Sequence, residues 1–572
     1  MSHQSVAGQR PTIRLEQGTY VGTTVTDEIP RAVEAFLGVP YAKCKRLARA
    51  QQPPVSAETF DASEYGPVCP SADPSLPADE ENCLGANVFR PAGRGHDDVK
   101  KLPVLVYCHG GAFNFGRGQD RNLAAFVSFA RRDVVAVSFN YRLGPLGFLP
   151  CGAGRDGGVS NLGLLDQRVL LEWVNGNIAA FGGDAEDVTV MGFSAGAHSL
   201  GHHLLSQPSR RLFRRAILES GAPTARAVLS AAHPRNESHF ASFLSHLSIP
   251  PKEALTRLRS VPLPKLLQAS LAVWSENAPS VQWPFQPSID NDVIPDLPIN
   301  TWLSPSVPSP PPLITGFNTS EGTMFVPANA SSPAAFKSFF ASLIPSLTSS
   351  DLETLDGLYP PASSYAPPPT PNHGSEFRRL AHAYGHYGYI APLLHSAHFA
   401  SKRGAPVWVY EYAAHADLGA ANHGDHVPAA TRDTDVLSPE RTPGLWAVSE
   451  AMHGFWSSFV TSESGAGPNE LPNSSGVEWP RFISPFGDVA GGGGDYVPQD
   501  DEAGETRGKI LVFGEGNDEL MGRRGQRRRG IVARVRTLTA AEVKQFRFWW
   551  DRVALSEGMG GVVLNGSNSS LL

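Results

Sequence analysis

The feature that most constrains this chain is a pentapeptide at residues 192–196 (GFSAG), placed between a buried strand and a helix. The pattern DVTVMGF at residues 187–193 indicates the strand, and residues 197–205 have helical composition. No other G-x-S-x-G occurs in the chain. A serine at such a turn is held in a strained backbone conformation, and the flanking glycines let neighbouring segments approach closely. The context predicts that Ser194 is a nucleophile at the edge of a sheet.

Six further apolar, β-branched runs alternate with helical patterns. They cover residues 102–108, 134–141, 215–219, 312–316, 407–412 and 509–513. Residues 161–180 carry apolar side chains at helical spacing. Strands of near-continuous hydrophobicity are typical of a sheet that helices cover on both faces. The pattern therefore predicts an α/β fold with a large, mostly parallel central sheet.

Composition excludes several classes of protein. The chain has 572 residues, of which 41% are hydrophobic and 18% charged, which is sufficient for a large core and excludes a disordered chain. The net charge of −7 gives no electrostatic footprint for nucleic acid. Because no run of 18 apolar residues occurs, we expect no transmembrane helix.

The middle of the chain differs from the rest. Residues 222–390 are rich in proline and in short amphipathic helical patterns. The stretches 304–312 and 359–371 cannot form a regular helix or a central strand, so they are predicted to be loops around inserted helices. The glycine run 491–494 and the basic run 523–530 are expected to be exposed surface. No domain boundary is evident, which favours one unit over residues 1–572.

The stretch 181–196, FGGDAEDVTVMGFSAG, resembles the serine signature of the type-B carboxylesterase and lipase family, which includes the cholinesterases. Further segments that resemble this family are residues 36–42, 140–148, 163–181, 456–469 and 479–480. The resemblance implies a single α/β-hydrolase domain. Phe193 stands where cholinesterases usually carry glutamate, so the resemblance favours a carboxylesterase of fungal type over a true cholinesterase.

A serine needs a base, and the base needs an orienting carboxylate; in α/β-hydrolases both follow the serine, acid first. Residues 316–325 (GFNTSEGTMF) follow a predicted strand and resemble the acid motif of the family, which implies that Glu321 is the acid. Ser320 stands where an aspartate is usual. Competing carboxylates lie in a segment that resembles a non-catalytic part of the family; they are Asp290, Asp292 and Asp296.

The residues alone leave the base open. Histidines after Glu321 that could serve are His373, His415, His423, His426 and His453. His423 follows the strand at 407–412, and its surroundings, ANHGDHVP, resemble the histidine loop of the family, which favours His423. His415 and His426 are expected at the surface or in a supporting role. His453 lies on a helical pattern, where a packed histidine is expected.

The loop at residues 109–113 (HGGAF) follows the strand at 102–108 and has the composition of an oxyanion hole. The resemblance assigns its N–H donors to Gly111 and Ala112, with the N–H of Ala195 as the third. Ala112 stands where many relatives have glycine, so its methyl group is expected to narrow the part of the site that receives the acyl group of the substrate. His109 is expected to pack beneath the loop.

Three functions fit these residues. The first is hydrolysis of carboxylic esters, including lipids or lactones, by acyl transfer through Ser194, His423 and Glu321. The second is a same-fold acyltransferase, lactonase or cyclising, thioesterase-like enzyme of a biosynthetic pathway. The third is a non-catalytic, cholinesterase-like adhesion protein, disfavoured because all three triad residues are present. No cofactor or metal is expected, since no C-x-x-C, H-E-x-x-H or P-loop motif occurs.

The five cysteines include one candidate pair. Cys69 and Cys83 lie in a segment that resembles the disulfide-closed loop of the family, although the residues around the second cysteine depart from its pattern. Cys108 ends a predicted strand and is expected to be an inert thiol. Cys44 and Cys151 have no expected partner.

The sequence gives two opposing indications of compartment. Residues 1–14 lack the apolar run of a secretory signal, which favours the cytoplasm. A disulfide favours an oxidising compartment. Sequons that favour secretion weakly begin at Asn236, Asn318, Asn329, Asn473, Asn565 and Asn568. The oligomeric state and the physiological ester stay open.

Overall fold

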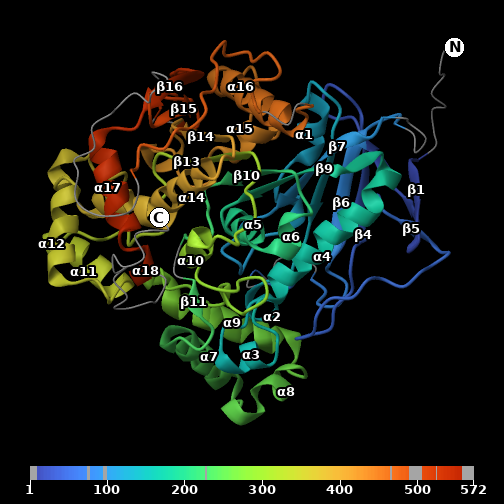
Figure 1. The fold of residues 1–572 in the computed structure, drawn as a ribbon, viewed down its shortest axis with the longest axis horizontal. Coiled ribbons are helices and arrows are strands. Elements are labelled where there is room, and N and C mark those ends of the chain that lie inside the picture. The colour runs from blue at the N-terminus through green and yellow to red at the C-terminus, as the bar shows by residue number, and fades with distance from the viewer. Residues whose placement is uncertain are drawn as a thin grey trace.

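The centre of the computed structural model is an eleven-stranded sheet (Figure 1). The model describes residues 10–71, 73, 78–94, 100–225, 228–463, 467–487, 506–522 and 525–556. The strands of this sheet are β3 (Thr23–Val25), β4 (Val33–Pro40), β6 (Gly85–Pro91), β7 (Leu102–Cys108), β8 (Val135–Phe139), β9 (Gly183–Phe193), β10 (Arg215–Glu219), β13 (Leu313–Asn318), β14 (Val407–Tyr412), β15 (Lys509–Phe513) and β16 (Ala533–Thr537). Their spatial order is β16-β15-β14-β13-β10-β9-β7-β8-β6-β4-β3.

The predicted strands form the parallel part of this sheet. The strands from β15 to β8 in spatial order pair in parallel, and the pairs at both ends of the sheet are antiparallel. β7, β10, β14 and β15 have the predicted bounds, whereas β8 is shorter and β9 longer than expected. The antiparallel strands β3, β4, β6 and β16 were not predicted. The prediction of a large, mostly parallel sheet is confirmed.

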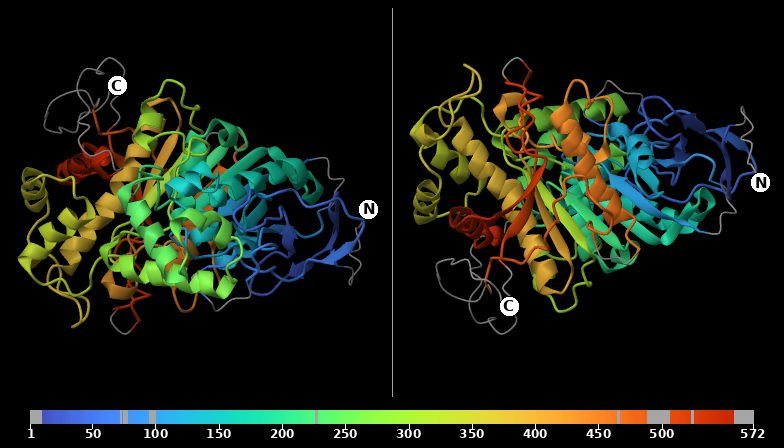
Figure 2. Two further views of the ribbon diagram at one scale, coloured as in Figure 1. Left: turned by 90° about the horizontal axis from the view of Figure 1, so that it is seen from below. Right: turned by 90° about the horizontal axis from the view of Figure 1, so that it is seen from above.

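Helices cover both faces of the sheet, because successive side chains of its strands point to opposite sides. In β7, Val106 and Cys108 belong to one buried cluster, whereas Leu105 and Tyr107 belong to another. The first cluster packs against α4 (Leu162–Asn177), α5 (Ala195–Leu205) and α14 (Ala391–Lys402). The second packs against α1 (Leu123–Phe129), α15 (Val427–Thr431) and α16 (Pro443–Val460) (Figure 2).

The remaining elements surround this core. The helices are α2 (Gly144–Gly147), α3 (Gly152–Asp156), α6 (Gln207–Arg210), α7 (Pro234–Leu247), α8 (Ala254–Leu258), α9 (Leu263–Asn277), α10 (Pro298–Leu303), α11 (Pro333–Leu343), α12 (Ser349–Leu358), α13 (Phe377–Gly385), α17 (Ala540–Trp550) and α18 (Val553–Ser556). One small sheet contains β1 (Thr12–Leu15), β2 (Gly18–Val21) and β5 (Thr59–Asp61). A second small sheet contains β11 (Leu229–Ser230) and β12 (Ser288–Ile289). None of the described helices is long and apolar enough to cross a membrane.

Much of the proline-rich middle forms helices at the periphery, although the same region also contains the central strand β13. The helices α7, α8 and α9 form a lobe at the bottom of Figure 1, and α11 and α12 lie at its left beside α17. Residues 304–312 form neither helix nor strand, and residues 359–371 contain only the short turn Ala362–Ser364. Residues 491–494 and part of the basic run at 523–530 lie outside the described residues.

The expected cysteine pair is present. A disulfide joins Cys69 to Cys83, with their Cα atoms 4.8 Å apart. The other cysteines, Cys44, Cys108 and Cys151, are buried free thiols. Burial raises the pKa of the Cys44 and Cys151 thiols to about 12, so neither forms a reactive thiolate at neutral pH.

Thiol titration tests this assignment. We expect native protein to show no fast-reacting thiol, because all three free cysteines are buried. Denatured protein should show three thiols before reduction and five after it. Replacing both Cys69 and Cys83 by serine should lower the free energy of unfolding by about 3 kcal/mol, since the cross-link restricts the unfolded chain. Five thiols before reduction would contradict the pairing.

Candidate active site

The candidate site lies where five neighbouring parallel strands end. β7, β9, β10, β13 and β14 are adjacent in the sheet and run in the same direction, so their carboxyl ends meet at one edge. The residues at or beyond the ends of these strands include His109–Ala112, Ser194, Glu219–Ser220, Glu321 and His423. Residues far apart in the sequence are thereby brought together, which is the arrangement that ligand sites of such sheets use.

Ser194 occupies the sharp turn between β9 and α5. Its backbone has φ 54° and ψ −121°, a conformation that a non-glycine residue adopts only when its surroundings impose it. The Ser194 N–H donates to the main-chain oxygen of Glu219 at 2.9 Å. A Cβ on Gly196 would lie 2.1 Å from the carbonyl oxygen of Cys108, so only glycine allows this approach of α5 to β7. The turn thus has the strained form predicted from the sequence.

Glu321 and His423 form a hydrogen-bonded pair beside this turn. The His423 Nδ1–H donates to Glu321 Oε2 at 2.5 Å. The neighbouring residues Ser320 and Asn422 form a parallel bridge, in which the Ser320 N–H donates to the carbonyl oxygen of Ala421 at 2.9 Å. The pairing of β13 with β14 therefore continues into the two loops and fixes the acid next to the imidazole.

The surroundings keep the Glu321 carboxylate ionised. Burial disfavours the charge, but the nearby His423 imidazole and the hydrogen bonds outweigh it, so the pKa of Glu321 lies below its ordinary value. Oε1 accepts from the Ser220 hydroxyl at 2.6 Å and from the Asn318 N–H at 2.7 Å. Glu321 is fully buried, whereas His423 keeps 7% of its side chain exposed, so the imidazole is the end of the pair nearer to solvent.

The competing carboxylates serve structural roles. Asp290 accepts hydrogen bonds from the Asn161 side chain and from the N–H groups of residues 292 and 294. Asp292 pairs with Arg49 and Arg168. Asp296 accepts from Asn300, which lies in α10.

Within the described residues, three of the competing histidines form no hydrogen bond with a carboxylate. His453 lies in α16 with its Nε2 3.0 Å from the carbonyl oxygen of Phe126, and burial lowers its pKa to about 3. His373 contacts the Thr370 hydroxyl. Burial lowers the pKa of His415, and its backbone N–H donates to the main-chain oxygen of Asn517 at 2.8 Å.

The first donor of the expected oxyanion hole is oriented by the residues beneath it. Gly111 has φ 107°, in the region that favours glycine. The carbonyl oxygen of Gly110 lies 2.8 Å from His109 Nδ1. The C=O of Gly110 and the N–H of Gly111 belong to one trans peptide and point in opposite directions, so the Gly111 N–H points away from His109. His109 itself stacks on Tyr141 beneath the loop, and burial lowers its pKa to about 4.

The second and third donors are also oriented. The Gly111 carbonyl oxygen accepts from the N–H groups of Asn114 and Phe115 at 3.0 and 2.8 Å, which directs the Ala112 N–H to the opposite side. Ala195 is the first residue of α5, where an N–H has no partner within the helix. Within the described residues, the N–H groups of Gly111, Ala112 and Ala195 donate no hydrogen bond.

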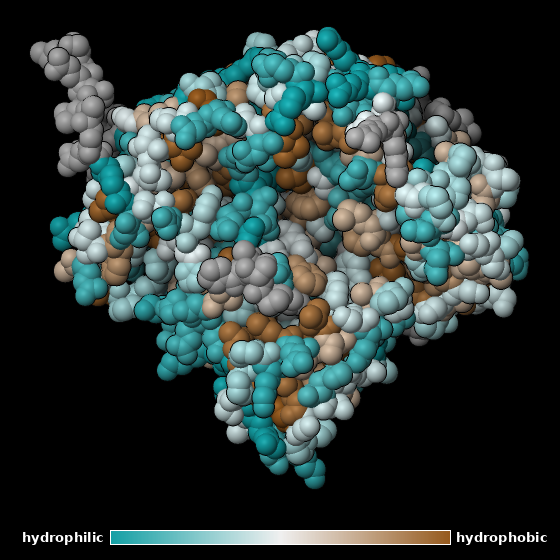
Figure 3. Space-filling view, turned by 180° about the vertical axis from the view of Figure 1, so that it is seen from behind, coloured by the Kyte–Doolittle hydropathy of each residue, from teal (hydrophilic) through white to brown (hydrophobic). Residues whose placement is uncertain are grey.

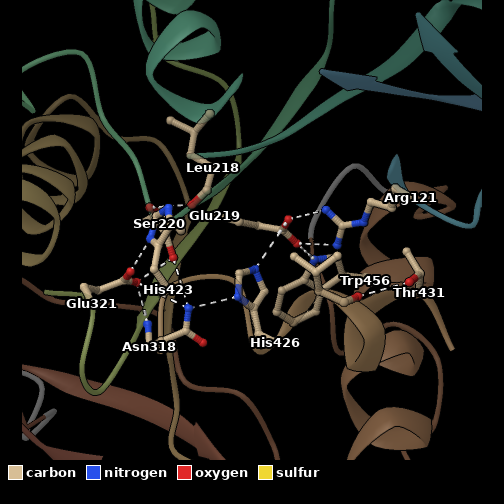
Figure 4. A network of polar contacts seen from close by, with 12 residues as sticks. Arg121, Leu218, Glu219, Ser220, Asn318, Glu321, His423, His426, Thr431 and Trp456 are labelled. Atoms are coloured by element: carbon tan, nitrogen blue, oxygen red, sulfur yellow. Dashed lines mark hydrogen bonds and ion pairs between the residues drawn. The ribbon is translucent and has the colours of Figure 1, made fainter. Parts of the chain in front are cut away.

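A second buried carboxylate lies directly beside Ser220 (Figure 4). Glu219 accepts from Arg121 at 2.5 and 3.1 Å and from the Trp456 indole N–H at 2.8 Å. Neither Glu219 nor Arg121 has any exposed side-chain surface. Burial disfavours the Glu219 charge, but Arg121 and His426 outweigh it and lower the pKa of Glu219 to about 2. A compensated pair of charges therefore lies under the site.

His426 and Asn318 connect the two carboxylates. His426 is fully buried, with Nε2 3.6 Å from Glu219 Oε2 and Nδ1 3.1 Å from the Asn318 amide nitrogen (Figure 4). The Asn318 amide also lies 3.4 Å from the Ser220 hydroxyl. His426 thus has the supporting position and not the surface one. The sequon at Asn318 cannot carry a glycan in this fold, because the side chain is buried.

Aromatic rings surround the imidazole of His423. The ring centroids of Phe193, Tyr389 and Phe325 lie 4.7, 4.6 and 5.2 Å from that of His423. Phe193 also contacts the ring of His426 at 5.5 Å. These rings restrict the orientation of the base and keep its surroundings apolar.

Sequence reasoning did not assign a role to Ser220, Asn318, Glu219 or Arg121. One signal was present, since a glutamate at the end of a buried strand requires a counter-charge. The partner could not be read from the sequence, because Arg121 precedes Glu219 by 98 residues.

Comparison with known proteins agrees with this geometry. Residues 9–489 match the carboxylesterase family. The chain is 32% identical to Secreted lipase 4 of Gibberella zeae over 81% of this chain and 85% of that protein. It is 30% identical to the para-nitrobenzyl esterase of Bacillus subtilis over 84% of this chain and 93% of that protein. The crystal structure of Aspergillus niger EstA matches with a TM-score of 0.76 at 25% identity, covering 96% of this chain and 99% of that one. The chain belongs to the carboxylesterase family and has its α/β-hydrolase fold.

Proposed function

We propose that this protein hydrolyses carboxylic esters by two-step acyl transfer through Ser194, with His423 as the base and Glu321 as the acid that orients it. The observation that carries the proposal is the hydrogen bond from His423 Nδ1 to the buried carboxylate of Glu321. This bond fixes the tautomer in which Nε2 accepts a proton. It also stabilises the imidazolium that forms when the serine is deprotonated.

The reaction needs no group beyond these side chains and the backbone. His423 removes the proton of the Ser194 hydroxyl as Oγ attacks the ester carbonyl. The negative charge that develops on the carbonyl oxygen is stabilised by the N–H groups of Gly111, Ala112 and Ala195. The alcohol leaves with the proton from His423, and water then attacks the acyl-enzyme by the same route.

The aromatic rings around His423 favour apolar groups of the substrate directly beside the base. Phe193 precedes the nucleophile and contacts His423, so this position offers no carboxylate to a quaternary ammonium group. Activity on a neutral short-chain ester is therefore the expected starting point. Transfer to an alcohol in place of water uses the same residues and would appear as a new ester when an alcohol is added.

Substitution of the three residues tests the proposal. Ser194→Ala, His423→Gln and Glu321→Gln should each lower kcat/KM for p-nitrophenyl butyrate by about 10⁴-fold, because each removes a member of one catalytic unit. The controls are His415→Gln and Asp292→Asn, which change a histidine and a carboxylate that, within the described residues, form no hydrogen bond or ion pair with Glu321 or His423. They should retain activity within about threefold. Unchanged activity of Ser194→Ala would refute the nucleophile.

The buried pair beneath the site gives a separate prediction about stability. Glu219→Gln should lower the free energy of unfolding by about 3–5 kcal/mol, because it leaves the buried Arg121 cation uncompensated. The double variant with Arg121→Met should lose less. Glu253→Gln, in an exposed pair with Arg257, should have little effect.

The same carboxylate sets a pH dependence. Its folded-state pKa of about 2 lies below its ordinary value of 4.5, so its contribution to stability is fully present above about pH 5. The contribution is lost as the pH falls from about 4.5 towards 2. In urea unfolding between pH 3 and 7, the free energy of unfolding should therefore decrease more steeply with falling pH in the wild type than in the double variant. Equal slopes would contradict this assignment.

A further inference from the structure

A cavity that is partly open to solvent lies beside the candidate oxyanion hole. Its walls include Phe113, His198, His202, Val228, Arg235 and Trp283. Phe113 directly follows Ala112 in the chain. The ring centroid of Tyr389 lies 6.0 Å from that of His198 and 4.6 Å from that of His423. One wall of the cavity is therefore separated from the proposed base by a single aromatic ring. The face opposite to that of Figure 1 is hollowed near its centre, with hydrophobic residues around the hollow (Figure 3).

The walls carry aromatic and aliphatic groups with one charge among them. His202 is fully buried, and burial lowers its pKa to about 3, so it is neutral at physiological pH. The other polar lining residues are the neutral Asn236, Gln282 and Gln286, and His198. Among the described residues that line the cavity there is no aspartate or glutamate, and Arg235 is the only charged side chain.

Arg235 lies near the start of α7 and has no counter-ion in the described chain. Its Nη2 donates to the carbonyl oxygen of Leu343 at 3.2 Å. Within the described residues it forms no ion pair, and the titratable group that acts on it is the Tyr387 phenol. Burial lowers the pKa of this guanidinium. By contrast, the buried Arg121 and Arg142 are each held by a carboxylate in a fork of hydrogen bonds. A partly buried guanidinium that has no carboxylate partner within the protein is suited to bind the carboxylate of a ligand in two parallel hydrogen bonds.

We infer that this cavity holds one side of the ester and that Arg235 binds a carboxylate on it. The preferred substrates are then esters that carry a free carboxylate, such as half-esters of dicarboxylic acids. The inference rests on the proposed ester hydrolysis at Ser194 and specifies its substrate class. The apolar walls would bind the hydrocarbon that separates the ester from the carboxylate, while the guanidinium compensates the charge that would otherwise be buried.

A substrate panel tests this inference. We would measure kcat/KM by titration of released acid for monomethyl esters of dicarboxylic acids of four to eight carbons, and for the corresponding dimethyl esters. Butyrate esters of hydroxy acids place the carboxylate on the alcohol side and show which side enters the cavity. The wild type should prefer at least one carboxylate-bearing ester over its neutral counterpart by at least tenfold. Preference for the neutral ester throughout would overturn the inference.

Variants of Arg235 assign the preference to this residue. In Arg235→Gln the ratio of kcat/KM between the anionic and neutral esters should fall at least tenfold, and Arg235→Lys should retain part of it, since lysine keeps the charge but not the fork. The control Arg257→Gln changes an exposed arginine of α8 and should leave the ratio unchanged. An unchanged ratio in Arg235→Gln, with the thermal unfolding midpoint of the wild type, would also overturn the inference.

Salt dependence in the wild type gives a test that needs no variant. Raising the ionic strength should increase KM for the anionic esters more than for the neutral ones, because the guanidinium is partly exposed. The role of Arg235 and the proposed ester hydrolysis can be refuted separately. Hydrolysis of neutral esters that requires Ser194, without any preference for a carboxylate, would refute only the role of Arg235. Absence of all ester hydrolysis would refute the proposed function.

Discussion

The structure depends on parallel pairing of neighbouring strands that continues past their ends. β13 and β14 pair in parallel, and the bridge between Ser320 and Asn422 extends this pairing into the loops. The residues that follow, Glu321 and His423, are thereby held within hydrogen-bond distance although 102 residues separate them. On the other side of β13, β10 ends at Glu219, whose carbonyl oxygen holds the N–H of Ser194. One sheet edge therefore positions all three members of the proposed triad.

The site also depends on compensation of the buried negative charges at this edge of the sheet. Two fully buried carboxylates flank Ser220: Glu219 precedes it, and Glu321 accepts a hydrogen bond from its hydroxyl at 2.6 Å. Like charges placed so close would otherwise favour protonation of one of the two carboxyls. Arg121 compensates the first, while His423 and two hydrogen bonds stabilise the second. The pKa of each carboxyl is lowered in consequence. Glu321 is then ionised when the proposed mechanism needs a negative charge beside the imidazole.

Much of the parallel core could be predicted from the sequence, and the network around the site could not. Strands such as β7 and β14 are buried on both faces and read as continuous apolar runs, so their bounds were predicted. The edge strands β3 and β16 are short and rich in polar residues, and they were missed. The pairing of Glu321 with His423 follows from a local motif in each loop. The pairing of Arg121 with Glu219 has no local signal, because it depends on where α1 begins relative to β10.

The central claim is that Ser194 is a nucleophile activated by His423 and Glu321. Its most direct test is covalent labelling with a fluorophosphonate, followed by peptide mass spectrometry. The account predicts one adduct per chain, located on the peptide that contains Ser194, with the rate of labelling reduced by at least about 10³-fold in His423→Gln. Labelling at another serine, or a rate that does not depend on His423, would contradict the account.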